Sequence, residues 1–250
     1  MKKYHQNLIP ALFLLSLLAI WEGAVRILKI PLYVLPSPVQ VIQTLLSELD
    51  TLSGHAGVTV AEAVCGMVIS LILALILGIL MDCFPVIRQG LYPLLVVTQT
   101  VPMIVMAPIL IIYLGFGMTP KILTVVLMCF FPIAVSFSDG LSQVEEDYVH
   151  LIRSYGAGRW MAYRLVKIPA AIPSLLSGLK VAATYSVSGA VVGEWIGSQS
   201  GLGYYLLRVK NGYMLDKVFA CVLIIIILSL FMNGIIRLWQ RAALPYLKQP

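Results

Sequence analysis

The longest charged passage of this apolar chain, residues 145–169, has the residue types of a segment that holds a partner protein. Its apolar side chains recur in helical rhythm on both sides of Gly156, which predicts two short amphipathic helices joined there. Glycine permits the positive φ that a sharp reversal requires, and Pro169 is expected to stop the second helix. This pattern indicates a surface on which a partner protein docks. The alternative is that both helices float among lipid headgroups, held by the basic side chains of the passage.

Neither a catalytic set nor a metal-binding set accompanies this passage. The histidines His5, His55 and His150 lie in separate predicted segments, and the four cysteines are too far apart for metal or redox chemistry. The sequence also lacks a Gly-x-x-x-x-Gly-Lys-Ser/Thr loop, the motif that cradles nucleotide phosphates. We therefore expect neither an enzyme nor a metal site, and any energy source must lie on another chain.

The composition identifies an integral membrane protein. Of 250 residues, 60% are hydrophobic and 11% are charged, and the mean hydropathy is +0.96; soluble proteins are about 25% charged. A spanning helix needs about 20 apolar residues. The sequence predicts an all-α membrane domain over residues 1–250 with six transmembrane helices, at about 8–28, 58–81, 92–114, 122–137, 172–196 and 218–236.

An even number of spans places both termini on the same side of the membrane. Lysines and arginines are more numerous on that side, so the positive-inside rule predicts that both termini and the loop over about 139–171 are cytoplasmic. Basic loops beside anionic lipid account for the net charge of +6, and no nucleic acid is required.

Two of the predicted spans are unusual. The third contains Pro102 and Pro108, which remove backbone donors, so we expect it to be kinked or opened. A broken helix is tolerated in the membrane where it faces protein or a cavity, although a kink used for packing alone is the alternative. The fifth span is rich in Gly, Ala, Ser and Thr and is expected at the centre of the bundle. Ser37 is expected to cap a short helix through about Leu49.

Polar and adaptable residues near the expected kink are candidates for a translocation path. Glu194, near the outer end of the fifth span, either lines this path or is an interfacial charge. Lys180, within the same span, is either a path residue or reaches the headgroups through its long stem. The candidates, for which hydrogen bonding between helices is the alternative, are Gln99, Thr100, Pro102, Met103, Tyr185, Ser188 and Glu194.

The charged passage also resembles a family signature. Gly156, followed after nine residues by Val166-Lys167-Ile168-Pro169, resembles the cytoplasmic signature of binding-protein-dependent ABC transporter permeases, which reads Glu-Ala-Ala, three residues, Gly, nine residues, Ile-x-Leu-Pro. This chain departs from it in carrying His150-Leu151-Ile152 in place of Glu-Ala-Ala. Acidic residues at positions 145–147 are available one turn earlier.

Further short motifs resemble one branch of that family. They are Leu35-Pro36-Ser37-Pro38, Val101-Pro102, Ala107-Pro108, Leu114-Gly115-Phe116-Gly117, and Glu194 followed by Ser200-Gly201-Leu202-Gly203. The branch they resemble imports nitrate, sulfonates, taurine and thiamine-precursor pyrimidines. The substrate favoured is a thiamine-precursor pyrimidine, ahead of sulfonates, taurine and nitrate.

The resemblance implies a type I ABC importer permease, paired with a second copy of itself, an ATPase subunit that binds ATP and Mg, and an extracytoplasmic binding protein. The passage would be the coupling helix that docks in a groove of the ATPase. Its docking residues would be Glu146, His150, Leu151, Ile152, Tyr155, Gly156, Ala157, Arg159, Trp160, Val166, Ile168 and Pro169. The alternatives are an ion-coupled secondary transporter, which needs a buried acidic site that the sequence does not show clearly, and a lipid-binding scaffold.

Overall fold

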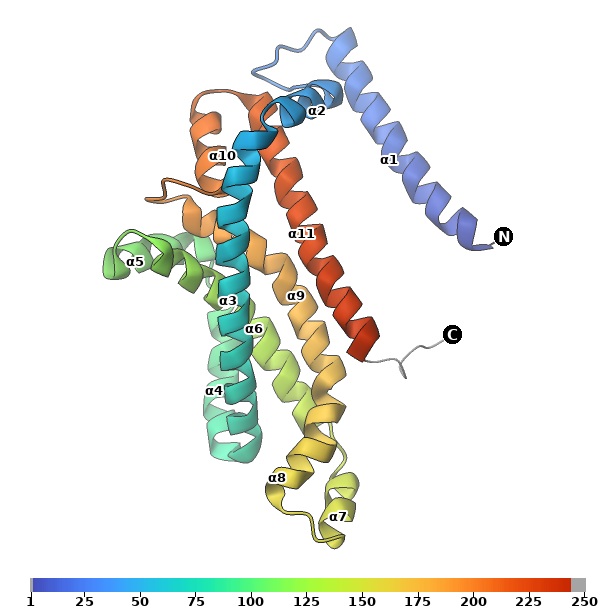
Figure 1. The fold of residues 1–250 in the computed structure, drawn as a ribbon, viewed down its shortest axis with the longest axis vertical. Helices are drawn as coiled ribbons and strands as arrows, with labels where there is room; N and C mark the ends of the chain where they lie inside the picture. Colours follow the sequence, from blue (N-terminus) through green and yellow to red (C-terminus); the bar gives the residue numbers. More distant parts are fainter. Residues whose placement is uncertain (1, 244–250) are drawn as a thin grey trace.

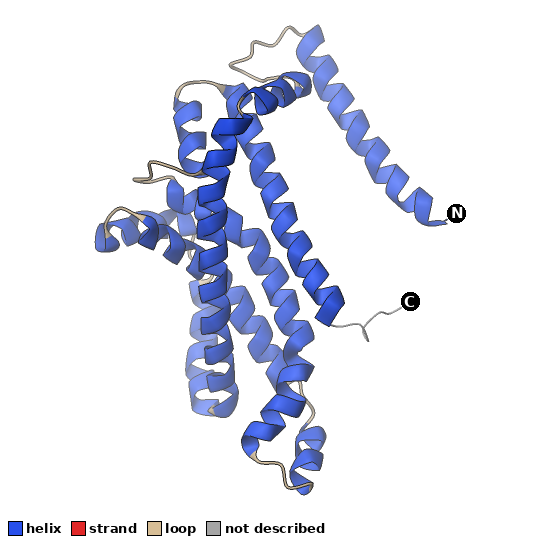
Figure 2. Cartoon of the chain, viewed as in Figure 1, coloured by secondary structure: helices blue, strands red, loops and turns tan. Residues whose placement is uncertain are grey.

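The computed structural model describes residues 2–243, and every regular element in that range is a helix (Figures 1 and 2). The predicted all-α class is confirmed. In chain order the elements are α1 (Lys2–Ile27), α2 (Pro38–Ser47), α3 (Leu49–Cys83), α4 (Pro85–Thr98), α5 (Met103–Leu114), α6 (Met118–Ser142), α7 (Glu146–Ser154), α8 (Arg159–Ala162), the π-helix η1 (Tyr163–Lys167), α9 (Ile168–Glu194), α10 (Leu202–Asn211) and α11 (Leu215–Ala243).

Five helical stretches within residues 2–243 are long and apolar enough to cross a membrane, and α4 with α5 adds a sixth when the pair counts as one broken span. The long helices run side by side, with α7 and α8 at one end of the molecule and α2 and α10 at the other (Figure 1). We call these the α7/α8 end and the α2/α10 end. Helix α1 stands apart from the bundle, and 6% of its apolar window is buried.

The core is a block of three close-packed helices, α3, α6 and α9. A Cβ added to Gly66 of α3 would lie 2.5 Å from Val125 Cβ of α6, and one added to Gly178 of α9 would lie 2.6 Å from the Pro132 carbonyl oxygen of α6. Hydrogen in place of a side chain therefore lets these backbones touch. Thirteen residues of α9 are buried, ending at Glu194, which confirms that the small-residue span lies at the centre.

The expected opening of the third span lies at Pro102. Helix α4 ends at Thr98, Pro102 precedes α5 in an extended conformation, and the two helix axes differ by 104°. Pro108, by contrast, lies inside α5 without ending it. Helix α5 consequently projects sideways from the bundle (Figure 1).

The expectation that Pro169 stops a helix is wrong. Helical structure runs without interruption from Arg159 to Glu194 and passes through Pro169. The reason lies in η1, where the Ile168 N–H bonds to the Tyr163 carbonyl, five residues back. This wider turn accommodates a residue that has no N–H to donate, and Pro169 lies in the first turn of α9, where proline is tolerated.

The α2/α10 end is held together by polar contacts. Ser37 caps α2, as predicted, in a reciprocal arrangement with Gln40. Glu48 accepts from Lys217 Nζ at 2.5 Å and from the Tyr205 hydroxyl at 3.3 Å. Burial, followed by the nearby Glu48 carboxylate, raises the pKa of Tyr205, so this phenol remains a donor throughout the physiological pH range.

Candidate functional site

The predicted docking loop forms a small hairpin at the α7/α8 end, beyond the ends of the long helices (Figure 1). Gly156 lies in its turn with a φ of 85°, so the positive φ expected there is confirmed. Val149 is buried and anchors α7, which packs on α8 and η1. The hairpin is thus a defined element and not a flexible linker.

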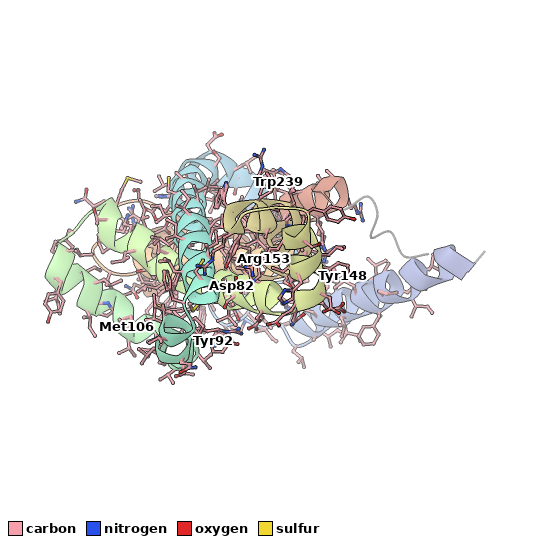
Figure 3. All side chains as sticks on the ribbon, turned by 90° about the horizontal axis from the view of Figure 1, so that it is seen from below. Asp82, Tyr92, Met106, Tyr148, Arg153 and Trp239 are labelled. Atoms are coloured by element: carbon pink, nitrogen blue, oxygen red, sulfur yellow. The ribbon has the colours of Figure 1, made fainter. Side chains whose placement is uncertain are left out.

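Large apolar side chains lie exposed on this hairpin. Tyr155 is 83% exposed and Trp160 is 69% exposed, and Figure 3 looks onto this end with Tyr148 at the edge of α7. An exposed apolar patch next to charged residues is typical of a protein interface. Of the predicted docking residues, the partly buried ones are Ile152, Ala157, Val166 and Ile168, and the exposed ones are Glu146, His150, Leu151, Tyr155, Gly156, Arg159, Trp160 and Pro169.

The sequence did not reveal how this hairpin is attached to the bundle. Arg159 Nη2 donates to the Cys83 carbonyl at 3.0 Å, and Lys167 Nζ donates to Asp82 Oδ2 at 2.6 Å. The Tyr163 hydroxyl is hydrogen-bonded to the same Asp82 oxygen. The sequence shows that Arg159, Tyr163 and Lys167 are spaced by four residues. It does not show that they contact the end of α3.

The break between α4 and α5 borders a cavity of about 370 Å³. Three of the predicted path residues, Gln99, Met103 and Tyr185, line it together, from the end of α4, the start of α5 and the middle of α9. Pro102 lies at the break itself. Thr100 is exposed and donates to the Val97 carbonyl, and the exposed Ser188 is not among the lining residues.

Glu194 lies elsewhere, in a sealed polar cluster toward the α2/α10 end. Its exposed fraction is 1%, so the alternative of an interfacial charge is wrong. Oε1 accepts from Thr59 Oγ1 at 2.7 Å and Oε2 accepts from the Gly203 N–H at 2.6 Å. Gly203 is in the first turn of α10, where N–H groups are unpaired and the helix dipole favours a carboxylate.

The glycines after Glu194 are explained by this contact. A Cβ on Gly201 would lie 2.1 Å from Glu194 Cδ, and Gly201 has a φ of 105°, which side-chain-bearing residues rarely adopt. The segment Ser200-Gly201-Leu202-Gly203 therefore wraps around the carboxylate.

A second carboxylate in this region was not recognised from the sequence. Glu62 of α3 is fully buried, and its Oε1 lies 3.1 Å from Lys121 Nζ of α6, while its Oε2 has no partner among residues 2–243. A signal was available, because Glu62 and Thr59 are three residues apart and so share a face of α3. Predicting the pair would have required knowing that α3 packs on α6.

Lys180 lines a cavity of about 630 Å³ between α9 and α11. Asn233 and Arg237 of α11 line the same cavity, and Asn233 Nδ2 donates to Thr184 Oγ1 at 2.8 Å. Lys180 is half-buried there, so its side chain borders a groove between two helices of this chain.

Comparison with known proteins places these features in a family. Residues 66–244 match the family described as "Binding-protein-dependent transport system inner membrane component". The Formylaminopyrimidine transport permease protein ThiX of Halalkalibacterium halodurans is 35% identical over 250 residues, covering 100% of both chains. The Taurine transport system permease protein TauC of Escherichia coli is 28% identical over 237 residues, covering 92% of this chain and 86% of TauC.

The fold agrees with that assignment. A solved structure entitled "Crystal structure of an amino acid ABC transporter with histidines" superposes with a TM-score of 0.65 over 80% of this chain and 97% of that one, at 18% identity. The superposition therefore supports the same arrangement of helices, and the family match and the full-length relative cover most of the sequence. The chain belongs to the family of inner membrane components of binding-protein-dependent transport systems, the permease subunits of ABC importers.

Proposed function

We propose that the solute translocated by this permease is a thiamine-precursor pyrimidine of the formylaminopyrimidine class. The observation that supports this most is the 35% identity to a formylaminopyrimidine permease over the full length of both chains, against 28% for the taurine permease. The cavity at the α4–α5 break fits the proposal in kind: about 370 Å³, lined by Gln99, which both donates and accepts hydrogen bonds, and by Tyr185 and Phe131, which offer aromatic faces.

We propose further that the hairpin at the α7/α8 end is the coupling element. In this proposal its exposed patch docks on an ATPase subunit, which binds ATP and Mg, and both chain termini lie on the same, cytoplasmic, side. The exposed Tyr155 and Trp160 support docking, because aromatic side chains are enriched at protein interfaces. The departure at residues 150–152 is compatible with docking, since Leu151 supplies an exposed apolar group in α7.

A complete transporter requires more than one chain in this proposal. A second copy of the permease would close the translocation path, and a binding protein would deliver the solute at the α2/α10 end. The exposed face of α9 that includes Val181 and Tyr185 borders the cavity at the break and supports a path lined by more than one subunit.

The alternative of an ion-coupled carrier without an ATPase is not favoured by family membership. The buried carboxylates that it requires do exist, but Glu62 is paired with Lys121 and both oxygens of Glu194 accept hydrogen bonds. Their partners, Lys121, Thr59 and Gly203, come from three helices, α6, α3 and α10, so both carboxylates join neighbouring helices.

Uptake into liposomes tests the proposal. The permease is purified with its ATPase, reconstituted, and supplied with the binding protein and ATP, and the uptake of labelled formylaminopyrimidine is compared with that of taurine. The expected result is ATP-dependent uptake of the pyrimidine and no ATP-dependent uptake of taurine. ATP-dependent uptake of taurine alone would overturn the substrate, and ion-driven uptake without the ATPase would overturn the class of transporter.

A further inference from the structure

We propose that Asp82, at the end of α3, is the positioning residue that ties the coupling hairpin to the membrane-spanning block. In this arrangement, movement of the hairpin reaches α3 through Asp82 and Cys83, in addition to the direct connection of η1 to α9. The inference rests on the proposed coupling role of the hairpin, and it assigns the route by which that role is carried out.

The contact is built from one face of the segment that follows Gly156. Arg159, Tyr163 and Lys167 are spaced by four residues, which places them in a row along a helix. All three reach the same end of α3: Arg159 bonds the Cys83 carbonyl at 3.0 Å, and Tyr163 and Lys167 both bond the Asp82 carboxylate. The segment from Arg159 to Lys167 therefore binds the end of α3 through three side chains spread over two helical turns.

The C-terminal end of α3 is chemically suited to these contacts. The last carbonyls of a helix have no partner within the helix, and the helix dipole favours a cation there; Arg159 supplies both a donor and a cation at Cys83. The Asp82 side chain is 7% exposed. Charge-assisted bonds in such a site are short and directional, and removal of either charge leaves the other buried without its counter-charge.

Among the residues that the structure describes, no side-chain hydrogen bond or ion pair joins α7 to α3. A polar cavity of about 500 Å³ lies between α7 and the ends of α3 and α6, and Asp82, Arg88, Glu146 and Arg153 are among the residues that line it. Figure 3, which looks onto this end, labels Asp82 and Arg153 near the middle of the view. Because α7 packs on α8 and η1, a force applied to α7 reaches the segment that contacts α3 and that continues into α9.

Helix α3 can carry the displacement to the opposite end of the block. Asp82 and Glu62 are twenty residues apart on one continuous helix, which corresponds to about 30 Å at 1.5 Å per residue. Close packing of Gly66 on Val125 keeps α3 and α6 together over this distance. A shift at Asp82 therefore reaches the Glu62–Lys121 pair, and Thr59 one turn beyond it, which holds Glu194.

The test compares transport with ATP hydrolysis in the reconstituted complex of permease, ATPase and binding protein. Asp82→Ala is expected to lower the number of solute molecules imported per ATP by about tenfold, a factor typical of coupling between sites, while the complex assembles and ATP hydrolysis continues. Glu22→Gln is the control, since it removes the charge of a carboxylate that lies at the other end of the molecule, 2.5 Å from Arg26, and keeps an oxygen that can accept from the Val39 N–H. Asp82→Glu is expected to restore most of the coupling.

A double variant separates coupling from folding. Asp82→Asn with Lys167→Met removes the ion pair without leaving a buried charge, and is expected to match the thermal stability of the wild type but to import as few solute molecules per ATP as Asp82→Ala. Wild-type coupling in this double variant would overturn the inference, and so would loss of ATPase assembly in Asp82→Ala. If the wild-type chain does not bind an ATPase at all, the proposed coupling function fails instead, whatever Asp82 does.

Discussion

Replacing Gly201 by alanine should destabilise the α2/α10 end of the protein. The new Cβ would lie 2.1 Å from Glu194 Cδ, and the backbone has φ of 105° and ψ of 162°. A residue with a side chain in that region costs about 1–3 kcal/mol, and overpacking of a filled site costs about another 1–3 kcal/mol. The two costs add, so the free energy of unfolding should fall by about 2–6 kcal/mol.

Gly212 provides the control at the opposite end of the same helix. It has a φ of −85°, and a Cβ there would lie 3.5 Å from its nearest neighbour, an ordinary van der Waals contact. Gly212→Ala should therefore change stability by less than about 0.5 kcal/mol.

The assay is equilibrium unfolding of the two variants and the wild type in one detergent, with amide hydrogen exchange at Gly203 as a local readout. Exchange at Gly203 should speed up in Gly201→Ala because the displaced Glu194 carboxylate no longer accepts from that N–H. If Gly201→Ala unfolds like Gly212→Ala and Gly203 stays protected, the contact between Gly201 and the carboxylate does not exist as described.

Three other predictions concern the buried pair, the hairpin and the cavity. Lys121→Met leaves Glu62 buried without its cation, so the free energy of unfolding should fall by about 3–5 kcal/mol, and Glu62→Leu in the same chain should recover much of the loss; no recovery would contradict the pairing. Gly156→Leu forces a side chain into a φ of 85°, and liposome uptake should be lost with membrane insertion retained; normal uptake would contradict the coupling role. Tyr185→Trp narrows the cavity at the helix break, and uptake should fall while ATP hydrolysis continues; undiminished uptake would remove this cavity from the path.

The features that the sequence predicted are those set by local chemistry. The small residues of the fifth span predicted its central place, Gly156 predicted a reversal, and Ser37 predicted a cap; each depends on a residue and its near neighbours. The opening at Pro102 was predicted on the same grounds, because proline removes a backbone donor wherever it stands.

The features that the sequence did not reveal depend on which helices meet. The pair of Glu62 and Lys121 is one such feature, because the two residues are 59 positions apart along the chain. The contact of Arg159, Tyr163 and Lys167 with α3 is another, because it depends on where α3 ends in space. Pro169 was expected to stop a helix because a π-turn cannot be recognised from composition.

The break at Pro102 also interrupts the backbone hydrogen bonding of the third span, because a helix end leaves backbone groups without helical partners. Such groups need a polar neighbour inside a membrane, and the cavity of about 370 Å³ beside the break is large enough to hold water. A polar solute in this cavity would exchange part of its hydration shell for the Gln99 amide and the Tyr185 hydroxyl, beside apolar side chains such as Phe131. In the proposed translocation path, the broken helix would thus lower the free-energy cost of dehydrating the solute.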